Sequence, residues 1–397
     1  MSKPRLGDRS LFPRLEPWAY LNHAAISPPS LPVHAAVEDS LAGYSRRGVG
    51  QFPLESERRG ELRAALATLL GCEANDLALT SNTSAGVIAV ASCVPWRVGD
   101  RVILFRGEFP TNVTPWQRAA ERHGLELCWL DADAFRHSPA VALQQLEHEI
   151  AKGARMVAVS AVQFQTGFAM PLAEIGALCA QADRTELFVD AIQGLGVLPL
   201  DVATIGAHYV SAGGHKWLMG PEGTGVLYAR RQSVERWRPE LASWLSHEEG
   251  LKFLFEGSGH LRYDRPFRRE VQWLERGASN ALGAAGLHAS VSLLLELGVS
   301  TIFEHVQRWH DRVEPALVER GWQSARATET PGRSGILSLR PPTSCDVLAL
   351  SQAAGELGVS LACPDGWIRL APHWPNHLDE CQRVVDVLTA AHERVAP

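Results

Sequence analysis

The sequence predicts an α/β fold in which helices cover both faces of a mostly parallel, seven-stranded sheet. Short apolar runs that predict strands alternate with helical segments from residue 77 to residue 228. The connections are long enough to return each strand parallel to the one before it. From about residue 281 the pattern changes to two long helices followed by short strands and helices, which predicts a smaller α+β region.

Composition excludes several classes of protein. The chain has 397 residues, 46% of them hydrophobic and 21% charged, as in ordinary globular proteins. Its net charge of −6 argues against nucleic-acid binding, which needs a basic surplus. Seven dispersed cysteines without a CxxC pair favour reduced thiols and a cytoplasmic location. No signal-like segment or 18-residue apolar run occurs, so we expect no membrane contact.

We expect three parts in the chain. The N-terminal segment is polar and interrupted by prolines, which predicts an extended arm. At its end Asn22 and His23 are candidate substrate contacts, although a capped loop explains them equally well. The expected boundaries are residues 1–26 for the arm, 27–275 for a large domain and 276–397 for a small C-terminal domain.

The helices and strands follow from periodicity and punctuation. A helix over 55–71 carries leucines on one face and ends at Gly71. The strand after residue 224 follows a tight glycine-rich turn, so we expect it to run antiparallel to its neighbour. The strands expected in the large domain are 77–79, 102–105, 127–130, 156–160, 187–190, 208–211 and 225–228. In the C-terminal region we expect helices over 283–298, 302–321 and 346–358 and strands over 336–340, 359–363 and 367–372.

Ligands of an open parallel sheet bind beyond the carboxyl ends of the strands, and polar motifs follow the predicted strands at these points. The turn TSNTSAGV (80–87) offers the hydroxyls of Thr83 and Ser84 and the free N–H groups of a helix start, which suit an anion. Serine and threonine are also ordinary helix caps, which is the alternative. In SAVQFQTG (160–167), Gln163 could bond a ring oxygen or a carboxylate.

Two further strand ends carry an aromatic ring and a carboxylate. Phe109, in GEFPTNVTPWQ (107–117), could stack on a bound aromatic ring, or it could be a core residue. Asp190, in LFVDAIQGLG (187–196), ends a buried run, where a carboxylate is costly unless it is paired with a cation. Asp190 could be the partner of a protonated ring nitrogen in a ligand. The alternative is that Asp190 only caps a helix.

Lys216 lies in HYVSAGGHKWLMGPEGTGVLY (208–228), after a strand that ends in small residues. The chain has only four lysines, so a lysine here is notable. A desolvated lysine can lose its proton and form a Schiff base with an aldehyde, whereas a surface lysine in a loop is the alternative. Anion cradle, aromatic plate, carboxylate and lysine together match the needs of pyridoxal 5′-phosphate.

At these motifs the chain resembles the class V aminotransferases of pyridoxal-phosphate fold type I, which include cysteine desulfurases, selenocysteine lyases, kynureninases and isopenicillin-N-epimerase-like enzymes. The stretches that carry the resemblance run in family order over nearly the whole chain: YLNHAA (20–25), SNTSAGV (81–87), GEFPTNVTPW (107–116), DAIQ (190–193), GHKW (214–217) and WIRLAPHWPN (367–376).

The resemblance implies roles for individual residues. Lys216 is similar to the family's Schiff-base lysine, and Asp190 to the partner of the pyridine nitrogen. Arg369 is similar to the arginine that grips the substrate α-carboxylate. The further cofactor contacts that it implies are the phenolic-oxygen ligand Gln193, the phosphate contacts Thr83 and Ser84 with His215 and Ser211 nearby, and the stacking residue Phe109.

Relatives of this kind are usually homodimers in which ERGASN (275–280) lends a phosphate contact across the interface. Ala278 stands where many relatives have threonine, so that contact would fall to Ser279 or to backbone N–H groups.

Desulfurases also carry a nucleophilic cysteine on a loop, which neither Cys345 nor Cys363 matches. We therefore interpret Cys363 as a small buried hydrophobic residue.

The sequence thus predicts a pyridoxal-phosphate enzyme acting at Cα of a small amino-acid substrate, as a transaminase or a C–S or C–C lyase. A cysteine desulfurase, a selenocysteine lyase or an epimerase remains the alternative, and the sequence does not choose the substrate. A nucleotide-dependent oxidoreductase is disfavoured, because the only glycine-rich candidate (220–225) has the wrong spacing and enters a strand. No metal site is expected, since His305 and His310 are five residues apart, off a shared helical face.

Overall fold

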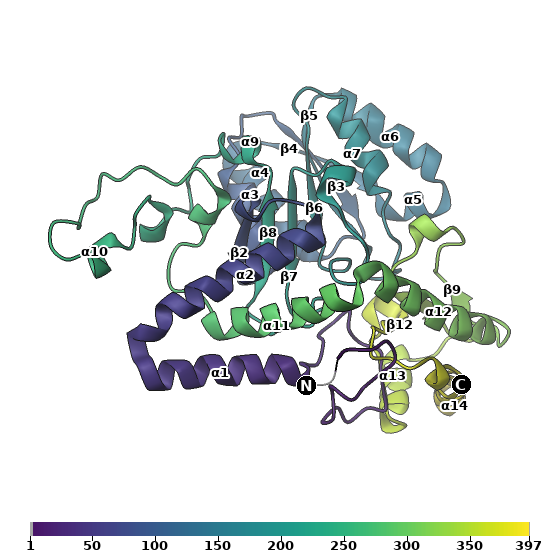
Figure 1. Ribbon diagram of the computed structural model, residues 1–397. Coiled ribbons are helices and arrows are strands. Elements are labelled where there is room, and N and C mark those ends of the chain that lie inside the picture. The colour runs from purple at the N-terminus through teal and green to yellow at the C-terminus, as the bar shows by residue number, and fades with distance from the viewer. Residues whose placement is uncertain (1–2, 397) are drawn as a thin grey trace.

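The computed structural model describes residues 3–396, which fold around a seven-stranded sheet (Figure 1). The strand order is β2-β8-β7-β6-β5-β3-β4, and β8 alone runs antiparallel to its two neighbours. The strands are β2 (Leu77–Thr80), β3 (Arg101–Arg106), β4 (Glu126–Asp131), β5 (Ala154–Ser160), β6 (Glu186–Asp190), β7 (Tyr209–Gly213) and β8 (Gly225–Ala229). The predicted sheet, including its antiparallel strand, is therefore confirmed.

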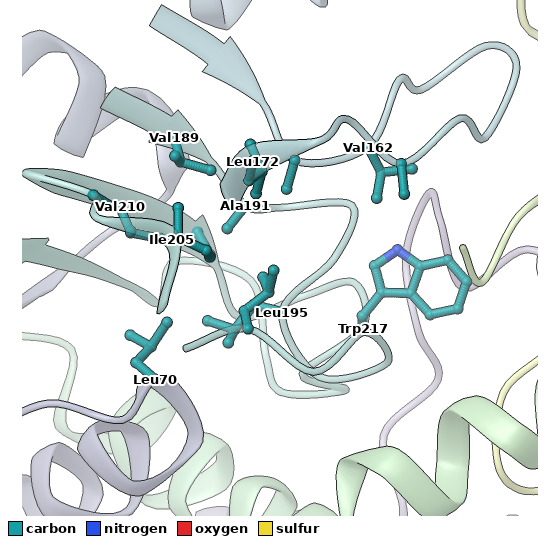
Figure 2. Close-up of a cluster of buried hydrophobic side chains, with 14 of the residues drawn as sticks. Leu70, Val162, Leu172, Val189, Ala191, Leu195, Ile205, Val210 and Trp217 are labelled. Carbon is teal, nitrogen blue, oxygen red and sulfur yellow. The ribbon is translucent and has the colours of Figure 1, made fainter. Parts of the chain in front are cut away.

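Alternating side chains on each strand supply two separate cores. On β3, Ile103 and Phe105 belong to one core, whereas Val102 and Leu104 belong to the other. Successive residues of a strand point to opposite faces, so a strand buried on both faces is apolar throughout. Figure 2 shows part of the first core, to which Leu70, Val189 and Trp217 contribute from distant parts of the chain.

Helices of the large region cover both faces of the sheet (Figure 1). Helices α2, α5 to α8 and α11 contribute to the first core, and α3 and α4 contribute to the second. The helices before residue 300 are α1 (Leu31–Arg47), α2 (Phe52–Leu70), α3 (Thr83–Cys93), α4 (Thr114–His123), α5 (Ala132–His137), α6 (Pro139–Ala151), α7 (Leu172–Ala180), α8 (Val202–Ile205), α9 (Arg231–Val234), α10 (Lys252–Phe255) and α11 (Ala281–Leu297), with α12 (Val299–Val318) beginning there.

The C-terminal part has a core of its own around a small antiparallel sheet. That sheet has the order β12-β10-β9 and carries Arg369 on β12. A short parallel pair, β1 with β11, ties the N-terminal segment to this region. The elements are β1 (Ala19–Tyr20), β9 (Gln323–Ser324), β10 (Leu337–Arg340), α13 (Val347–Glu356), β11 (Val359–Ser360), β12 (Ile368–Leu370) and α14 (Cys381–Val395).

One strand of the C-terminal region is shorter than expected. The strand expected over 359–363 stops at Ser360, and Cys363 lies beyond it, half-buried against the C-terminal core. Pro364 cannot donate to a ladder, and Asp365 then adopts a left-handed conformation with φ 49°, so the chain turns there.

The boundary expected between residues 275 and 276 stays a prediction. Helix α11, which follows this point, packs on α1 and α2 and supplies Leu287 and Val291 to the first core.

No single helix within residues 3–396 is long and apolar enough to cross a membrane, and only the bent pair α11–α12 meets that test jointly.

Candidate active site

The carboxyl ends of three adjacent strands bring the predicted polar residues together. Ser160 on β5 pairs in register with Asp190 on β6, which pairs with Ser211 on β7. Parallel strands end at one edge of a sheet, so the segments that follow them also meet at this edge. The loop after β7 carries Lys216, and the loop after β3 carries Phe109.

Lys216 is held by its backbone, which leaves its amine free. The Lys216 carbonyl oxygen accepts a hydrogen bond of 2.6 Å from Ser27 Oγ and one of 2.9 Å from the Met219 N–H. Trp217, the next residue, is fully buried and donates from Nε1 to Gln193 Oε1 at 2.9 Å. The amine itself lies 5.6 Å from the centre of the Phe109 ring.

The surroundings of Lys216 favour the neutral amine. Burial lowers the pKa of Lys216 to about 8; the charge of Asp190 opposes this shift and that of Arg369 adds to it. A neutral amine is the nucleophilic form, so an appreciable fraction is reactive near neutral pH.

Asp190 is a buried carboxylate with little compensation. It is 2% exposed, and its Oδ1 accepts one hydrogen bond, of 3.0 Å, from the Ile192 N–H. Within residues 3–396 it forms no ion pair, and burial raises its pKa to about 6 against the opposing effects of Ile192 and Lys216. A cationic ring nitrogen beside Asp190 would supply the missing charge.

The first turn of α3 lies where the sequence predicts an anion cradle. Asn82 caps the helix by accepting from the Ala85 N–H at 2.8 Å. Thr83 Oγ1 is buried and has no hydrogen-bond partner among the described residues. Ser84 Oγ lies 2.9 Å from Thr111 Oγ1, and Ser211 Oγ donates to the Thr83 carbonyl at 3.0 Å. The helix start thus presents free N–H groups and an unused hydroxyl.

The approach of α3 to β7 depends on Gly86. A Cβ atom at this position would come within 2.1 Å of Ser211 Oγ, so a larger residue would push the cradle away from the strand end. Ser211 therefore fixes the position of the cradle through Thr83. His215 also lies beside β7, and burial lowers its pKa, so that the ring is neutral near pH 7.

Arg369 reaches the same edge from the small sheet. Its guanidinium is 5% exposed and donates from Nη1 to the Phe164 carbonyl at 2.9 Å, while its Nε is buried without a partner among the described residues. Burial lowers the pKa of Arg369 to about 10. Phe164 also meets Phe109 edge to face at 5.3 Å, and Phe109 is 45% exposed. A half-exposed ring here is available to a ligand.

The remaining predicted residues divide into two groups. Gln193 uses both ends of its amide inside the protein, since Nε2 donates to the Ala24 carbonyl at 3.0 Å while Oε1 accepts from Trp217. Gln163 donates from Nε2 to Glu108 Oε1 at 3.3 Å. Ser279 lies elsewhere, in a surface depression shared with Ser81, where its hydroxyl contacts Arg59.

Asn22 and His23 lie in the N-terminal segment where it crosses to β12. Asn22 forms a bridge with Ala371, and its Oδ1 is buried without a partner among residues 3–396. The His23 Nδ1 lies 2.7 Å from Ser27 Oγ, and burial holds its pKa well below the usual range. His23 thus supports the serine that binds the Lys216 backbone.

Sequence reasoning missed Glu108 and Ser27. Glu108 is half-buried, accepts from the Ser160 N–H at 2.7 Å and also contacts the Ser160 hydroxyl. Burial raises the pKa of Glu108 to about 7, and the Asp190 charge adds to this. Glu108 follows a buried strand, as Asp190 ends one, so the rule that singled out Asp190 could have found it. Ser27, between an isoleucine and two prolines, carries no such signal.

Comparison with known proteins found a matching family model and similar sequences. The family model described as aminotransferase class-V matches residues 19–341. An uncharacterised aminotransferase, YcbU of Bacillus subtilis (strain 168), is 26% identical over 383 residues, which are 96% of each chain. A probable cysteine desulfurase of Aeropyrum pernix is 30% identical over 349 residues, which cover 83% of this chain and 81% of that one.

A similar fold occurs in a solved structure of a lysine-to-alanine mutant of C-DES with glycine covalently linked to the pyridoxal-phosphate cofactor. The TM-score is 0.87 at 23% identity, and the match covers 96% of this chain and 98% of that one. The similarity confirms the predicted fold.

Proposed function

Because this chain belongs to the class V aminotransferases, a family of pyridoxal-phosphate-dependent enzymes that act on amino acids, we propose that Lys216 binds the cofactor's aldehyde and that the enzyme reacts at Cα of its substrate. The observation that carries the proposal is that a half-buried, partly neutral lysine and a buried aspartate without an ion pair among the described residues follow neighbouring strands at one edge of the sheet.

The unsatisfied groups of the site suit each part of pyridoxal phosphate. The orphaned Thr83 hydroxyl and the start of α3 would hold the phosphate. Asp190 would face the ring nitrogen and keep it protonated, because the cation offsets the cost of burying the carboxylate. Phe109 would cover the ring, and Ser211 and His215 would flank the cradle.

The protein's own groups then have distinct tasks. The cofactor supplies an electron sink for the electron pair released at Cα. Arg369 binds the substrate α-carboxylate, for which its unpartnered Nε and remaining N–H groups are suited. The Lys216 amine takes a proton from Cα and returns it, and its pKa of about 8 lies close enough to neutrality for both steps.

Roles for Gln163, Gln193, Asn22 and His23 toward cofactor or substrate stay predictions. One amide proton of Gln193 is left for a phenolic oxygen after its two protein contacts. Gln163 is oriented by Glu108, so any contact with a ligand would be made by its carbonyl oxygen or its other amide proton.

We favour transamination or cleavage of a C–S or C–C bond. Cys345 and Cys363 both pack against the C-terminal core, which supports neither as a persulfide carrier. Burial also raises the pKa of Cys345, which disfavours the thiolate. Desulfurization, selenocysteine cleavage and epimerisation are the alternatives.

We also propose a cytoplasmic homodimer with its active sites at the interface. The seven cysteines are all free, which suits a reducing compartment. Ser279 lies in a surface depression that Ser81 and Ala85 of the cradle turn also line, and we propose that a partner's copy of this segment supplies a phosphate contact there. The segment around α10 projects from the body in Figure 1 and exposes Phe255 and Tyr263, as an interface would.

Absorption spectroscopy tests the cofactor assignment. The purified protein with added pyridoxal phosphate should show a visible absorption band that Lys216→Ala abolishes. Lys252→Ala is the control, because this lysine lies in α10, and it should leave the band intact. A protein that gains no band with added cofactor, or a K216A variant that retains it, would refute the role of Lys216.

A panel of amino acids then distinguishes the reactions. Transamination yields a keto acid without ammonia, elimination yields both, cysteine desulfurization yields sulfide and alanine, and epimerisation changes only optical rotation. Sulfide with alanine as the only products would refute our preference.

A further inference from the structure

A second cavity, of about 730 Å³, lies at the opposite edge of the large sheet. Arg155 is the second residue of β5, Glu186 begins β6 and His208 directly precedes β7, and all three line it. The strands are about five residues long at about 3.3 Å per residue, so this cavity is roughly 15 Å from the candidate active site. Its volume is within the range of small-ligand sites.

The lining of this cavity is strongly basic. Its acidic residues are Asp183 and Glu186, and its arginines are Arg97, Arg155, Arg184, Arg230, Arg236 and Arg238. The chain as a whole carries a net charge of −6, so positive charge is concentrated here. Clefts lined by one sign of charge attract ligands of the other sign.

Glu186 is already saturated by its neighbours. Arg155 and Arg236 each donate to it at 2.6 Å, and the Tyr209 and Ser233 hydroxyls occupy its remaining acceptor positions. Burial alone would raise the pKa of Glu186, but these partners lower it overall. The Glu186 carboxylate therefore has no acceptor position free for the other arginines of the cavity.

Arg230 and His208 face each other as two donors. His208 Nδ1 accepts from the Leu187 N–H at 3.2 Å, so the proton of the neutral ring resides on Nε2. Arg230 Nη1 lies 3.4 Å from that Nε2, while its Nη2 donates to the backbone at Gly206. Burial lowers the pKa of His208 to about 4, so the ring stays neutral near pH 7. In that tautomer two N–H groups lie side by side, and an acceptor next to them would relieve their repulsion.

The outer arginines also lack acidic partners. Arg97 and Arg238 line the cavity, and neither forms an ion pair within the described part of the chain. Arg184 lies 3.6 Å from Asp100, and that pair is more than half exposed on the arginine side. At least three guanidinium groups therefore remain available to a ligand.

We propose that this cavity binds a small polyanion of the di- or triphosphate class, at a site separate from the active site. A phosphate oxygen between Arg230 and His208 would accept from both donors. Arg97 and Arg238 would then hold the outer phosphates through paired N–H groups, the geometry in which guanidinium binds phosphate. A single monoanion would leave most of this charge unmatched.

Calorimetric titration of the holoenzyme with inorganic tripolyphosphate tests the proposal, because pyridoxal phosphate then fills the other phosphate site. We expect saturable binding that weakens as salt is raised. Arg97→Gln/Arg238→Gln should weaken it about tenfold or more, since exposed charge-assisted contacts are lost. Arg118→Gln, which removes an exposed arginine on α4, should change nothing.

Adding Arg230→Gln should weaken binding further, with the visible cofactor band unchanged as a sign of intact folding. ATP binding more tightly than tripolyphosphate would assign the ligand to nucleotides, and equal or weaker binding would assign it to free polyphosphates. No saturable binding to the wild-type holoenzyme, or equal affinity in the double variant, would overturn the proposal.

Discussion

The two ends of strand β6 carry buried carboxylates in opposite electrostatic situations. Glu186, at the amino end, is neutralised by Arg155 and Arg236, and its pKa is lowered. Asp190, at the carboxyl end, has one backbone N–H donor, and its pKa is raised to about 6. The residues are four positions apart on one strand, so burial alone does not distinguish them.

The difference separates a structural charge from a functional one. A compensated carboxylate such as Glu186 is offset by its partners inside the fold, and removing one member of such a buried pair leaves the other charge uncompensated. An uncompensated one such as Asp190 costs stability until a cation arrives, which is typical of a site built for a ligand. The same contrast applies to Lys216, a half-buried residue whose amine lies beside the Phe109 ring and forms no ion pair among the described residues.

The largest effect should come from removing Glu186. Glu186→Ala leaves Arg155 buried without its counter-charge, and the free energy of unfolding should fall by about 3–5 kcal/mol. Asp190→Asn removes a buried charge that forms no ion pair within residues 3–396, so the apoprotein should be equally stable or more stable at pH 7.5. Urea unfolding of the two apoproteins measures both. Equal destabilisation by the two substitutions would remove the distinction.

The two carboxylates should also respond to pH with opposite signs. Asp190 has a folded pKa of about 6, above its unfolded value of about 3.9, so its contribution is present below pH 4 and lost as pH rises through 6. The wild-type apoprotein should therefore lose on the order of 3 kcal/mol relative to Asp190→Asn between pH 4 and pH 7.

Glu186 should show the reverse. Its folded pKa is lowered, so the stability that it provides is present above its unfolded pKa and is lost as pH falls. Unfolding of Glu186→Gln and the wild type at several pH values should therefore converge under acid conditions. Parallel pH profiles for the Asp190 and Glu186 variants would contradict the comparison.

A smaller loss is expected at Arg369. Arg369→Gln should leave the visible cofactor band unchanged and raise KM for the amino acid by about 10- to 100-fold, as expected for losing charged hydrogen bonds of about 1.5–3 kcal/mol. Steady-state kinetics and the absorption spectrum measure the two effects. Arg340→Gln, on the neighbouring strand β10, is the matched control. An unchanged KM in R369Q would refute contact with the carboxylate.

The sequence was sufficient for much of this picture because the signals were local. Seven apolar runs predicted seven strands, and polar residues directly after them predicted which edge carries Lys216 and Asp190. Contacts between distant segments had no such signal. Nothing near Ser27 indicates that it binds the backbone of Lys216, 189 residues away.

The same limit applies to amide side chains and to the arginines. Gln193 follows Asp190 as a cofactor ligand would, but nothing in the sequence indicates that its amide also contacts Trp217 and Ala24. The cavity at the amino edge draws on arginines spread from residue 97 to residue 238, which only the strand order brings together. Periodicity predicts faces and edges, whereas tertiary packing decides which side chains meet.

The smallest expected effect is a change in the pKa of Lys216 when Phe109 is replaced. This change measures how much the ring stabilises the protonated amine. A ring 5.6 Å from the Lys216 amine stabilises the protonated form by about 0.5–1 kcal/mol and also contributes to burial, which favours the neutral form. Phe109→Leu keeps an apolar side chain and removes the π face, so the pKa of Lys216 should fall below its value of about 8 by about half a unit. The pH dependence of aldehyde capture by the apoprotein reports this pKa. A rise of this pKa in Phe109→Leu would contradict the prediction. It would mean that the ring acts mainly by excluding water from the amine, which would then lack a compensating partner, as Asp190 does.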